Sequence, residues 1–294
     1  MQIEIPTPSI FNFNHILKHL DRSPQELLHY VEEDRVWKWV KWKGESGLIS
    51  FIHDGDHFQL NLHEYSSGLA DLLPEYLSTW FDLDQDLDKF YQLVKEDGLL
   101  APLSSSLYGL RVVGVHGLFE ALSWAIIGQQ VNLSFAYSMK KRLIENYGSS
   151  LLYRDKNYWS FPEPKAIMQA KIEDLMGLSI SRRKAEYLIE VANQMEKGDL
   201  SIENLQKLGK AEEIEKKLCK IRGIGPWTAN YVMLRCLRIP SAYPVGDAGL
   251  QNAVKQRLKM VRKPSSEELY SLAENWKGWE AYATFYLWNG LNKE

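Results

Sequence analysis

The sequence has very little cysteine, since only Cys219 and Cys236 occur among its 294 residues. Two cysteines exclude a disulfide framework, and they exclude a structural zinc or iron–sulfur site with four thiolate ligands. The 7 histidines are scattered without the spacing of a zinc site. We therefore expect two reduced thiols, with a single disulfide as the alternative, and no side-chain metal site.

Long hydrophobic runs are also missing. The longest apolar stretch, residues 118–131, is interrupted by Glu120 and by the pair Gln129-Gln130. It is too short for a membrane span of about 20 apolar residues. Residues 1–6 lack the basic segment and apolar core of a secretory signal. These absences predict a cytoplasmic protein that has no membrane partner.

The net charge is small, −3 at pH 7, but its distribution is uneven. Residues 1–100 contain 8 basic and 18 acidic side chains, a net charge of −10, whereas residues 101–294 contain 27 and 20, a net charge of +7. This change of sign suggests two modules, the second of which could face a polyanion. A solvated surface without a partner is the alternative that charge alone leaves open.

The first hundred residues predict an α+β fold. Asp54-Gly55 is a turn sequence, and apolar residues alternate along 58–62 as in a half-buried hairpin strand. Residues 36–43 alternate tryptophan or valine with lysine, which predicts an edge strand protected by its lysines. Stacking on nucleic acid bases is the alternative there. The acidic run 82–88 predicts the start of a helix, because carboxylates favour helix N-termini.

A short segment with proline and three serines, residues 101–106, predicts a linker. We therefore predict two domains, 1–100 and 101–294. Beyond the linker, the apolar pattern of 118–129 predicts a central, buried helix. The second domain is predicted to be helical almost throughout, with further helices at about 133–147, 165–176, 181–197, 211–221, 226–237, 248–260 and 266–288.

The most informative segment is Gly223-Ile224-Gly225-Pro226, where one predicted helix ends and another begins. Proline suits the first position of a helix, and the two glycines allow positive φ and a close approach of another backbone. The free N–H groups at the start of the second helix would suit a phosphate. A plain helix–helix corner is the alternative. A dinucleotide fingerprint does not fit, because Thr228 replaces its last glycine and a helix precedes it.

These residues resemble the helix-hairpin-helix motif of the DNA glycosylase superfamily. The motif, 221–229, is followed by a Gly/Pro-rich loop that contains Asp247, as in that superfamily. Upstream, 125–131 matches the helix end and loop that such enzymes push against DNA, and aromatic residues between 276 and 288 resemble the last helix of the family. The most similar group is that of the DNA-3-methyladenine glycosylase II enzymes. It implies a TATA-binding-protein-like antiparallel sheet with helices, followed by an all-α helix-hairpin-helix glycosylase domain.

The resemblance implies that Asp247 is the catalytic residue. Cutting an N-glycosidic bond develops positive charge on the deoxyribose, which a fixed carboxylate stabilises. An ordinary helix N-cap is the alternative role for this residue. Members that also nick the strand carry a Schiff-base lysine where this chain has Trp227. We therefore expect a monofunctional hydrolase with water as the acceptor and without abasic-site lyase activity.

The resemblance also assigns the aromatic residues Trp227, Tyr231 and Trp288 to the substrate pocket. Purines alkylated at N3 or N7 are cationic, and a cation is attracted to the face of an electron-rich ring. Such a base is already a good leaving group, so a strong general acid is unnecessary. Packing in the core is the alternative role for each ring.

Contacts with DNA follow from the same resemblance. The target base must leave the duplex to be reached, and Gln130 matches the residue that fills the vacated space. Leucine can serve there in the resembled enzymes, so Gln130 departs from that pattern. Gly223, Gly225 and Thr228 are expected to bind the DNA backbone. The resemblance also implies one monovalent cation, Na⁺ or K⁺, bound by the backbone carbonyls of Cys219, Ile221 and Ile224.

The sequence as a whole predicts a monomeric DNA glycosylase of base excision repair that needs no cofactor for its reaction. Its expected partner is double-stranded DNA that contains alkylated purines, such as 3-methyladenine or 7-methylguanine. One alternative is a glycosylase for deaminated or mismatched bases. The other is a non-catalytic DNA-binding protein that uses the hairpin only for phosphate contact.

Overall fold

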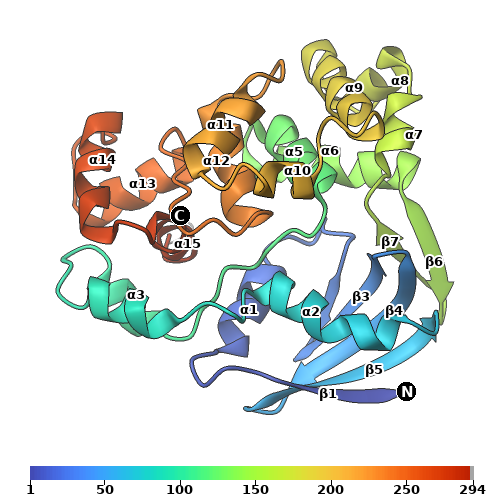
Figure 1. Cartoon of the computed structure of the whole chain (residues 1–294), viewed down its shortest axis with the longest axis horizontal. Coiled ribbons are helices and arrows are strands. Elements are labelled where there is room, and N and C mark those ends of the chain that lie inside the picture. The colour runs from blue at the N-terminus through green and yellow to red at the C-terminus, as the bar shows by residue number, and fades with distance from the viewer. Residues whose placement is uncertain (292–294) are drawn as a thin grey trace.

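The computed structural model describes residues 1–291. The N-terminal part contains a five-stranded antiparallel sheet (Figure 1), with strands β1 (Gln2–Pro6), β2 (Tyr30–Glu32), β3 (Arg35–Trp42), β4 (Glu45–His53) and β5 (His57–Tyr65). The spatial order is β1-β5-β4-β3-β2. The predicted hairpin is confirmed: Gly55 has a φ of +112° in the turn between β4 and β5, which glycine adopts without strain.

Two helices, α1 (Phe13–Leu20) and α2 (Leu69–Phe81), pack against the buried face of this sheet. Phe13 of α1 and Phe81 of α2 both contact the Phe58 ring, at centroid distances of 5.7 and 5.5 Å. Residues 58, 60 and 62 are buried, as their alternation predicted. The α+β class of the N-terminal part is therefore confirmed.

Strand β3, with its tryptophans and lysines, is not an edge strand. It lies between β4 and β2, although β2 pairs only with Arg35–Trp37. The Trp37 ring stacks on His63 at 4.9 Å and lies 5.9 Å from Tyr158. The edge prediction was wrong because β2 pairs with the start of β3, and a second hairpin, distant in sequence, packs against the same part of the sheet.

That second hairpin consists of β6 (Ser149–Tyr153) and β7 (Lys156–Ser160). This hairpin was not predicted, and it lies inside the region that was expected to be helical. Its turn residues Arg154 and Asp155 have φ values of +47° and +62°, which a two-residue turn of this kind requires. Neither residue is the glycine or asparagine that usually marks such a turn.

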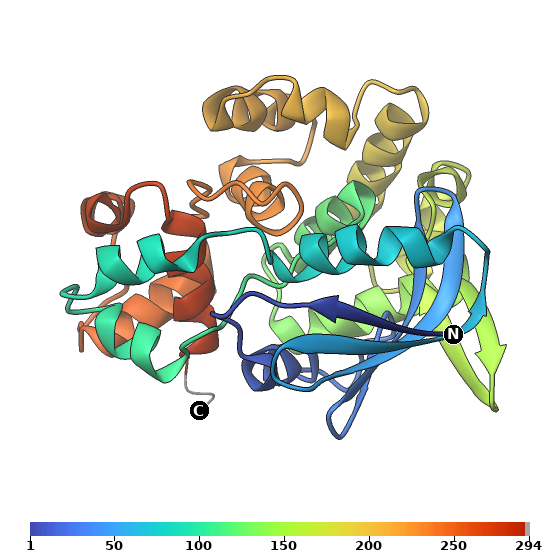
Figure 2. The same cartoon turned by 60° about the horizontal axis from the view of Figure 1, so that its bottom comes forward.

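The predicted linker is wrong, because residues 101–106 form helix α4 (Ala101–Ser106) with Pro102 in its first turn. Leu103 is buried, and the serine hydroxyls of α4 donate to carbonyls within the helix. The acidic run does precede a helix, α3 (Leu87–Val94), as predicted. Both helices lie beside the C-terminal helices (Figure 2). A domain boundary near residue 100 stays a prediction.

The rest of the chain is mainly helical, and α5 (Leu118–Gly128) is its buried central helix, as predicted. Two predicted helices are broken: 165–176 into α7 and α8, and 266–288 at Gly278, whose φ is +83°. The remaining helices are α6 (Leu133–Tyr147), α7 (Pro164–Met168), α8 (Ile172–Gly177), α9 (Arg182–Glu196), α10 (Ile202–Gln206), α11 (Ala211–Cys219), α12 (Pro226–Arg235), α13 (Ala248–Arg257), α14 (Ser266–Ala273), the short 3₁₀ helix η1 (Glu274–Trp276) and α15 (Glu280–Asn289).

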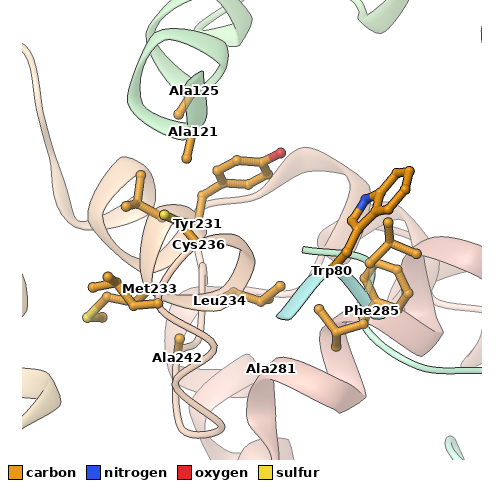
Figure 3. Packing of buried hydrophobic residues seen from close by; sticks show 14 of the residues in the cluster. Trp80, Ala121, Ala125, Tyr231, Met233, Leu234, Cys236, Ala242, Ala281 and Phe285 are labelled. Atoms are coloured by element: carbon orange, nitrogen blue, oxygen red, sulfur yellow. The ribbon is translucent and has the colours of Figure 1, made fainter. Parts of the chain in front are cut away.

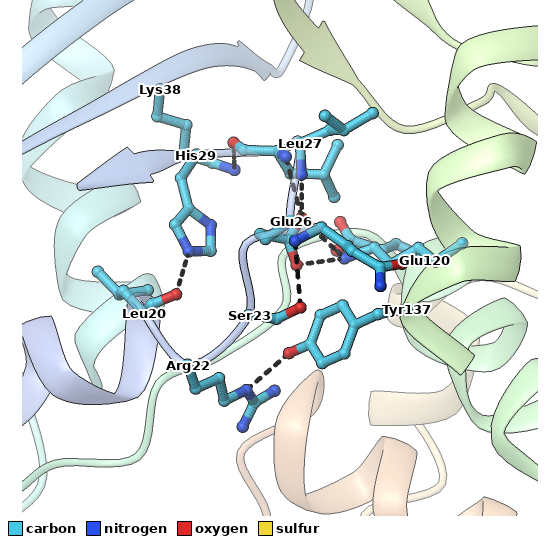
Figure 4. A network of polar contacts seen from close by, with 12 residues as sticks. Leu20, Arg22, Ser23, Glu26, Leu27, His29, Lys38, Glu120 and Tyr137 are labelled. Atoms are coloured by element: carbon cyan, nitrogen blue, oxygen red, sulfur yellow. Dashed lines mark hydrogen bonds and ion pairs between the residues drawn. The ribbon is translucent and has the colours of Figure 1, made fainter. Parts of the chain in front are cut away.

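A buried polar network joins the N-terminal segment to helix α6 (Figure 4). Lys140 lies 3.0 Å from Glu26 and 3.5 Å from Glu120, and Arg22 donates to the Tyr137 hydroxyl at 2.7 Å. Burial raises the pKa of Glu26, but the charges of Lys140 and His29, with the hydrogen bonds from Leu28 and Lys140, together outweigh it and lower that pKa to about 2. Each buried charge in this ion pair is thus compensated by its partner.

Both cysteines are free thiols. Cys236 is buried, and burial raises the pKa of its thiol to about 12. Within residues 1–291, the side chains form no group of three or more His, Cys, Asp and Glu residues that could hold a metal ion. No helix in the same range is long and apolar enough to cross a membrane.

Candidate active site and DNA-binding turn

The turn between α11 and α12 depends on its first glycine. Gly223 has a φ of +90°, and a Cβ atom there would lie 2.3 Å from the Tyr187 ring. Gly225 is different, because its φ of −101° suits any residue and a Cβ would meet no atom within 4 Å. Gly225 is the N-cap of α12 and Pro226 its first residue. The turn therefore leaves an open approach to the free N–H groups of α12.

Asp247 is the N-cap of α13, and its carboxylate accepts three hydrogen bonds. The backbone N–H of Leu250 donates to Oδ1 at 2.7 Å. The indole N–H groups of Trp288 and Trp227 donate to Oδ1 at 2.7 Å and to Oδ2 at 3.0 Å. The carboxylate is half-buried and fixed in orientation by donors from three helices.

The three predicted pocket residues form one aromatic row. The Tyr231 ring lies between the other two, with centroid distances of 6.1 Å to Trp227 and 6.1 Å to Trp288. Tyr231 is buried beside α5 (Figure 3), and burial raises the pKa of its hydroxyl. Both tryptophans are half-buried. Their bonds to Asp247 were not predicted, and they join the aromatic row and the carboxylate into one unit.

The loop after α5 lies against the hairpin, a contact that was not predicted. Gln130 is exposed and has a φ of +55°. The side-chain amide of Gln129 donates to the Gly223 carbonyl at 2.9 Å and to the Thr228 hydroxyl at 3.2 Å. Thr228 as a whole residue is 1% exposed, so its side chain offers no surface to DNA, and its contact with the DNA backbone stays a prediction.

Two residues that hold this loop were missed. Gln129 bonds the hairpin, as described, and the Lys184 ammonium donates to the carbonyls of Ile127 and Gln129, both at 2.8 Å. Because the acceptors are backbone carbonyls, the sequence carries no side-chain signal for these contacts.

The hairpin carbonyls expected to bind a cation differ in their contacts. Ile221 accepts from the backbone N–H of Ile224 at 3.1 Å. The carbonyls of Cys219 and Ile224 accept no backbone hydrogen bond from any residue in the described part of the chain. Two of the three expected oxygens thus carry no backbone hydrogen bond within the described residues, and the cation site itself stays a prediction.

Comparison with known proteins places this geometry in a family. Residues 123–278 match the HhH-GPD superfamily of base excision DNA repair proteins. The chain is 40% identical to the DNA-3-methyladenine glycosylase of Bacillus subtilis (strain 168), over 98% of this chain and 97% of that protein. It is 31% identical to the DNA-3-methyladenine glycosylase 2 of Escherichia coli (strain K12), over 82% of this chain and 80% of that protein.

A solved structure shares the whole fold. The 3-methyladenine DNA-glycosylase from Archaeoglobus fulgidus superposes with a TM-score of 0.84, at 23% identity, over 98% of this chain and 97% of that one. The sheet, the helical part and their arrangement are therefore common to both proteins. By its sequence and its fold, the chain belongs to the HhH-GPD superfamily of base excision DNA repair proteins.

Proposed function

We propose that this protein is a DNA glycosylase of base excision repair that hydrolyses the N-glycosidic bond of alkylated purines in double-stranded DNA. The observation that carries the proposal is the Asp247 carboxylate, fixed by the indole N–H groups of two residues of the aromatic row. A pure DNA-binding module needs no carboxylate beside a DNA-binding turn. The relatives of this protein in Bacillus subtilis and Escherichia coli are named as DNA-3-methyladenine glycosylases.

Asp247 acts on the sugar rather than on the base. As the glycosidic bond breaks, positive charge develops on the deoxyribose, and the fixed carboxylate stabilises it without reorganising. The cationic base leaves with the electron pair of the broken bond and becomes neutral, and water then adds to the sugar carbon and releases one proton to solvent. The three donors keep both carboxylate oxygens in place throughout.

The aromatic row supplies affinity for the lesion. A purine alkylated at N3 or N7 carries a positive charge, which the faces of Trp227, Tyr231 and Trp288 attract. A normal base lacks that charge and also costs more to remove from its pair. Discrimination therefore arises from the rings and from the ease of flipping together.

The reaction stops at base removal. A lyase step needs an amine that forms a Schiff base with the sugar. Trp227 occupies the first turn of α12, where the strand-nicking relatives carry their lysine, and its N–H is already used by Asp247. With water as the acceptor, the product is an intact strand with an abasic site.

DNA is held by backbone groups of the hairpin and by the loop after α5. The open side of Gly225 admits a phosphate to the first N–H groups of α12. Carbonyls of Cys219, Ile221 and Ile224 would hold a monovalent cation beside that phosphate and reduce its charge. Gln130 enters the duplex where the base has left. One monomer contains every residue of this site.

The test is excision from a panel of duplexes, each with one lesion: 3-methyladenine, 7-methylguanine, hypoxanthine, uracil or a mismatch. We expect release of the two alkylated bases at rates well above those of the other members. Preferential release of a deaminated or mismatched base would contradict the assigned substrate. Binding without release of any base would contradict catalysis and leave a DNA-binding protein.

A further inference from the structure

The backbone of Gln130 adopts a left-handed conformation, which requires contacts that stabilise it. Its φ of +55° is uncommon for a residue with a side chain, and such a conformation persists only where surrounding contacts determine it. The side chain is exposed and forms no hydrogen bond with any residue in 1–291. The restraint therefore acts on the neighbouring backbone.

Lys184 supplies that restraint from helix α9. Its ammonium donates to the carbonyls of Ile127 and Gln129, each at 2.8 Å. These carbonyls lie at and just beyond the C-terminus of α5, where they lack helical partners and favour a cation. The Gln129 carbonyl belongs to the peptide that leads into Gln130, so the ammonium fixes the plane from which Gln130 projects.

The loop is held from its other side by the hairpin. The Gln129 side chain donates to the Gly223 carbonyl at 2.9 Å and to Thr228 at 3.2 Å. The loop is therefore bound between α9 and the DNA-binding turn. The neighbouring Arg182 does not take part, because it pairs with Glu173 at 3.0 Å on the surface.

We propose that Lys184 is a positioning residue for base flipping, which holds the Gln129–Gln130 peptide so that Gln130 can enter the space left by the target base. This inference rests on the proposed function, in which Gln130 contacts DNA. Lys184 makes no hydrogen bond to Asp247 or to the aromatic row within the described residues. It acts on the flipping step and not on bond cleavage.

The experiment compares Lys184→Met, which keeps the length of the side chain, with Lys184→Arg, which keeps the charge and the donors. Arg183→Met is the matched control, because it removes one charge from the same exposed helix turn, where Arg183 has no hydrogen bond or ion pair with residues 1–291. Single-turnover release of 7-methylguanine is measured from a paired duplex and from a duplex in which the lesion faces an abasic site. A 2-aminopurine beside the lesion reports flipping by fluorescence.

We expect Lys184→Met to slow release from the paired duplex about 10- to 100-fold, as small misplacements of a positioned group do. The 2-aminopurine signal should fall in parallel. The unpaired lesion flips easily, so its release should stay within about 3-fold of the wild-type rate. Lys184→Arg should recover most of the activity.

A double-mutant cycle with Gln130→Ala tests the route of the effect. If Lys184 acts through Gln130, Lys184→Met costs little more once Gln130 is truncated. Three results would overturn the proposal. The losses of release rate from Lys184→Met and Gln130→Ala could be fully additive, or Lys184→Met could slow release from paired and unpaired lesions equally. The third is a loss of rate in Lys184→Met no larger than that in Arg183→Met. A wild-type protein that releases no base would defeat the proposed function instead, and the fluorescence of the variants would still test Lys184.

Discussion

Replacement of Asp247 by asparagine tests the proposed catalytic role directly, and the structure shows what it perturbs. The carboxylate accepts from Leu250 and Trp288 on Oδ1 and from Trp227 on Oδ2. Asparagine has a single oxygen. If that oxygen keeps the first two bonds, the amide NH₂ faces the Trp227 N–H, and two donors then meet at the former Oδ2 position.

The expected cost to the fold is moderate. Loss of one hydrogen bond and the opposition of two donors at a half-buried site cost about 1–2 kcal/mol of the free energy of unfolding. For a protein of this size that corresponds to a Tm lower by roughly 2–8 °C. The effect on the reaction is larger, because one preorganised electrostatic group typically contributes about 10²- to 10³-fold in rate.

The assay is single-turnover release of 7-methylguanine, 3-methyladenine and hypoxanthine by wild type and Asp247→Asn, with DNA binding and Tm measured in parallel. Binding should be retained or improved, because a carboxylate near phosphates is repulsive in the ground state. A neutral base that the enzyme accepts should show a larger defect than a cationic one, which leaves more readily.

The matched control is Asp86→Asn, which alters an aspartate that caps α3 without touching the site. Release of every accepted base by Asp247→Asn at the wild-type rate would refute the reasoning and leave Asp247 as a helix cap.

Three further predictions concern DNA binding, the product and acid. Gly225→Ala should fold normally, since its Cβ meets nothing within 4 Å. The variant should nevertheless bind all DNA sequences more weakly in a salt-dependent assay, because the added methyl group blocks a phosphate site that carries no base information. Gly223→Ala should instead lower the Tm. Borohydride should trap no covalent adduct, and gels should show strand cutting only after alkali, because Trp227 offers no amine. Burial lowers the pKa of His29 to about 4, so below pH 6.5 the unfolded chain takes up a proton at this residue that the folded chain does not. His29 alone should therefore lower the free energy of unfolding by up to about 1.4 kcal/mol per pH unit between pH 6.5 and pH 4. His29→Gln should remove this part of the fall in a pH series of Tm values.

Features with a local physical signature were predictable from the sequence. The hairpin at Asp54-Gly55, the turn at Gly223 and the start of α12 at Pro226 each follow from what glycine or proline permits. The family resemblance added Asp247 and the aromatic row, which the structure brings together. In each of these cases the informative residues are neighbours in the chain or belong to a known motif.

Features that depend on distant backbone could not be predicted. The second hairpin turns through Arg154-Asp155, which carries no usual turn signal, and it is covered by packing against β3. Residues 101–106 have a loop-like composition, but they form a helix because the C-terminal helices bury Leu103. Lys184 binds carbonyls, whose positions no side-chain pattern records.

The same distinction explains why the site is harder to read than the fold. Trp227 and Trp288 look in the sequence like pocket walls, and in the structure their N–H groups also orient Asp247. In the proposed mechanism recognition and catalysis would therefore share atoms, because the indoles that would face the base also hold the carboxylate. Because the donors come from α12 and α15, which are separated by more than forty residues in the chain, this coupling is a property of helix packing and not of any motif. In the proposed function, this coupling would tie selectivity for the lesion to the rate of bond cleavage.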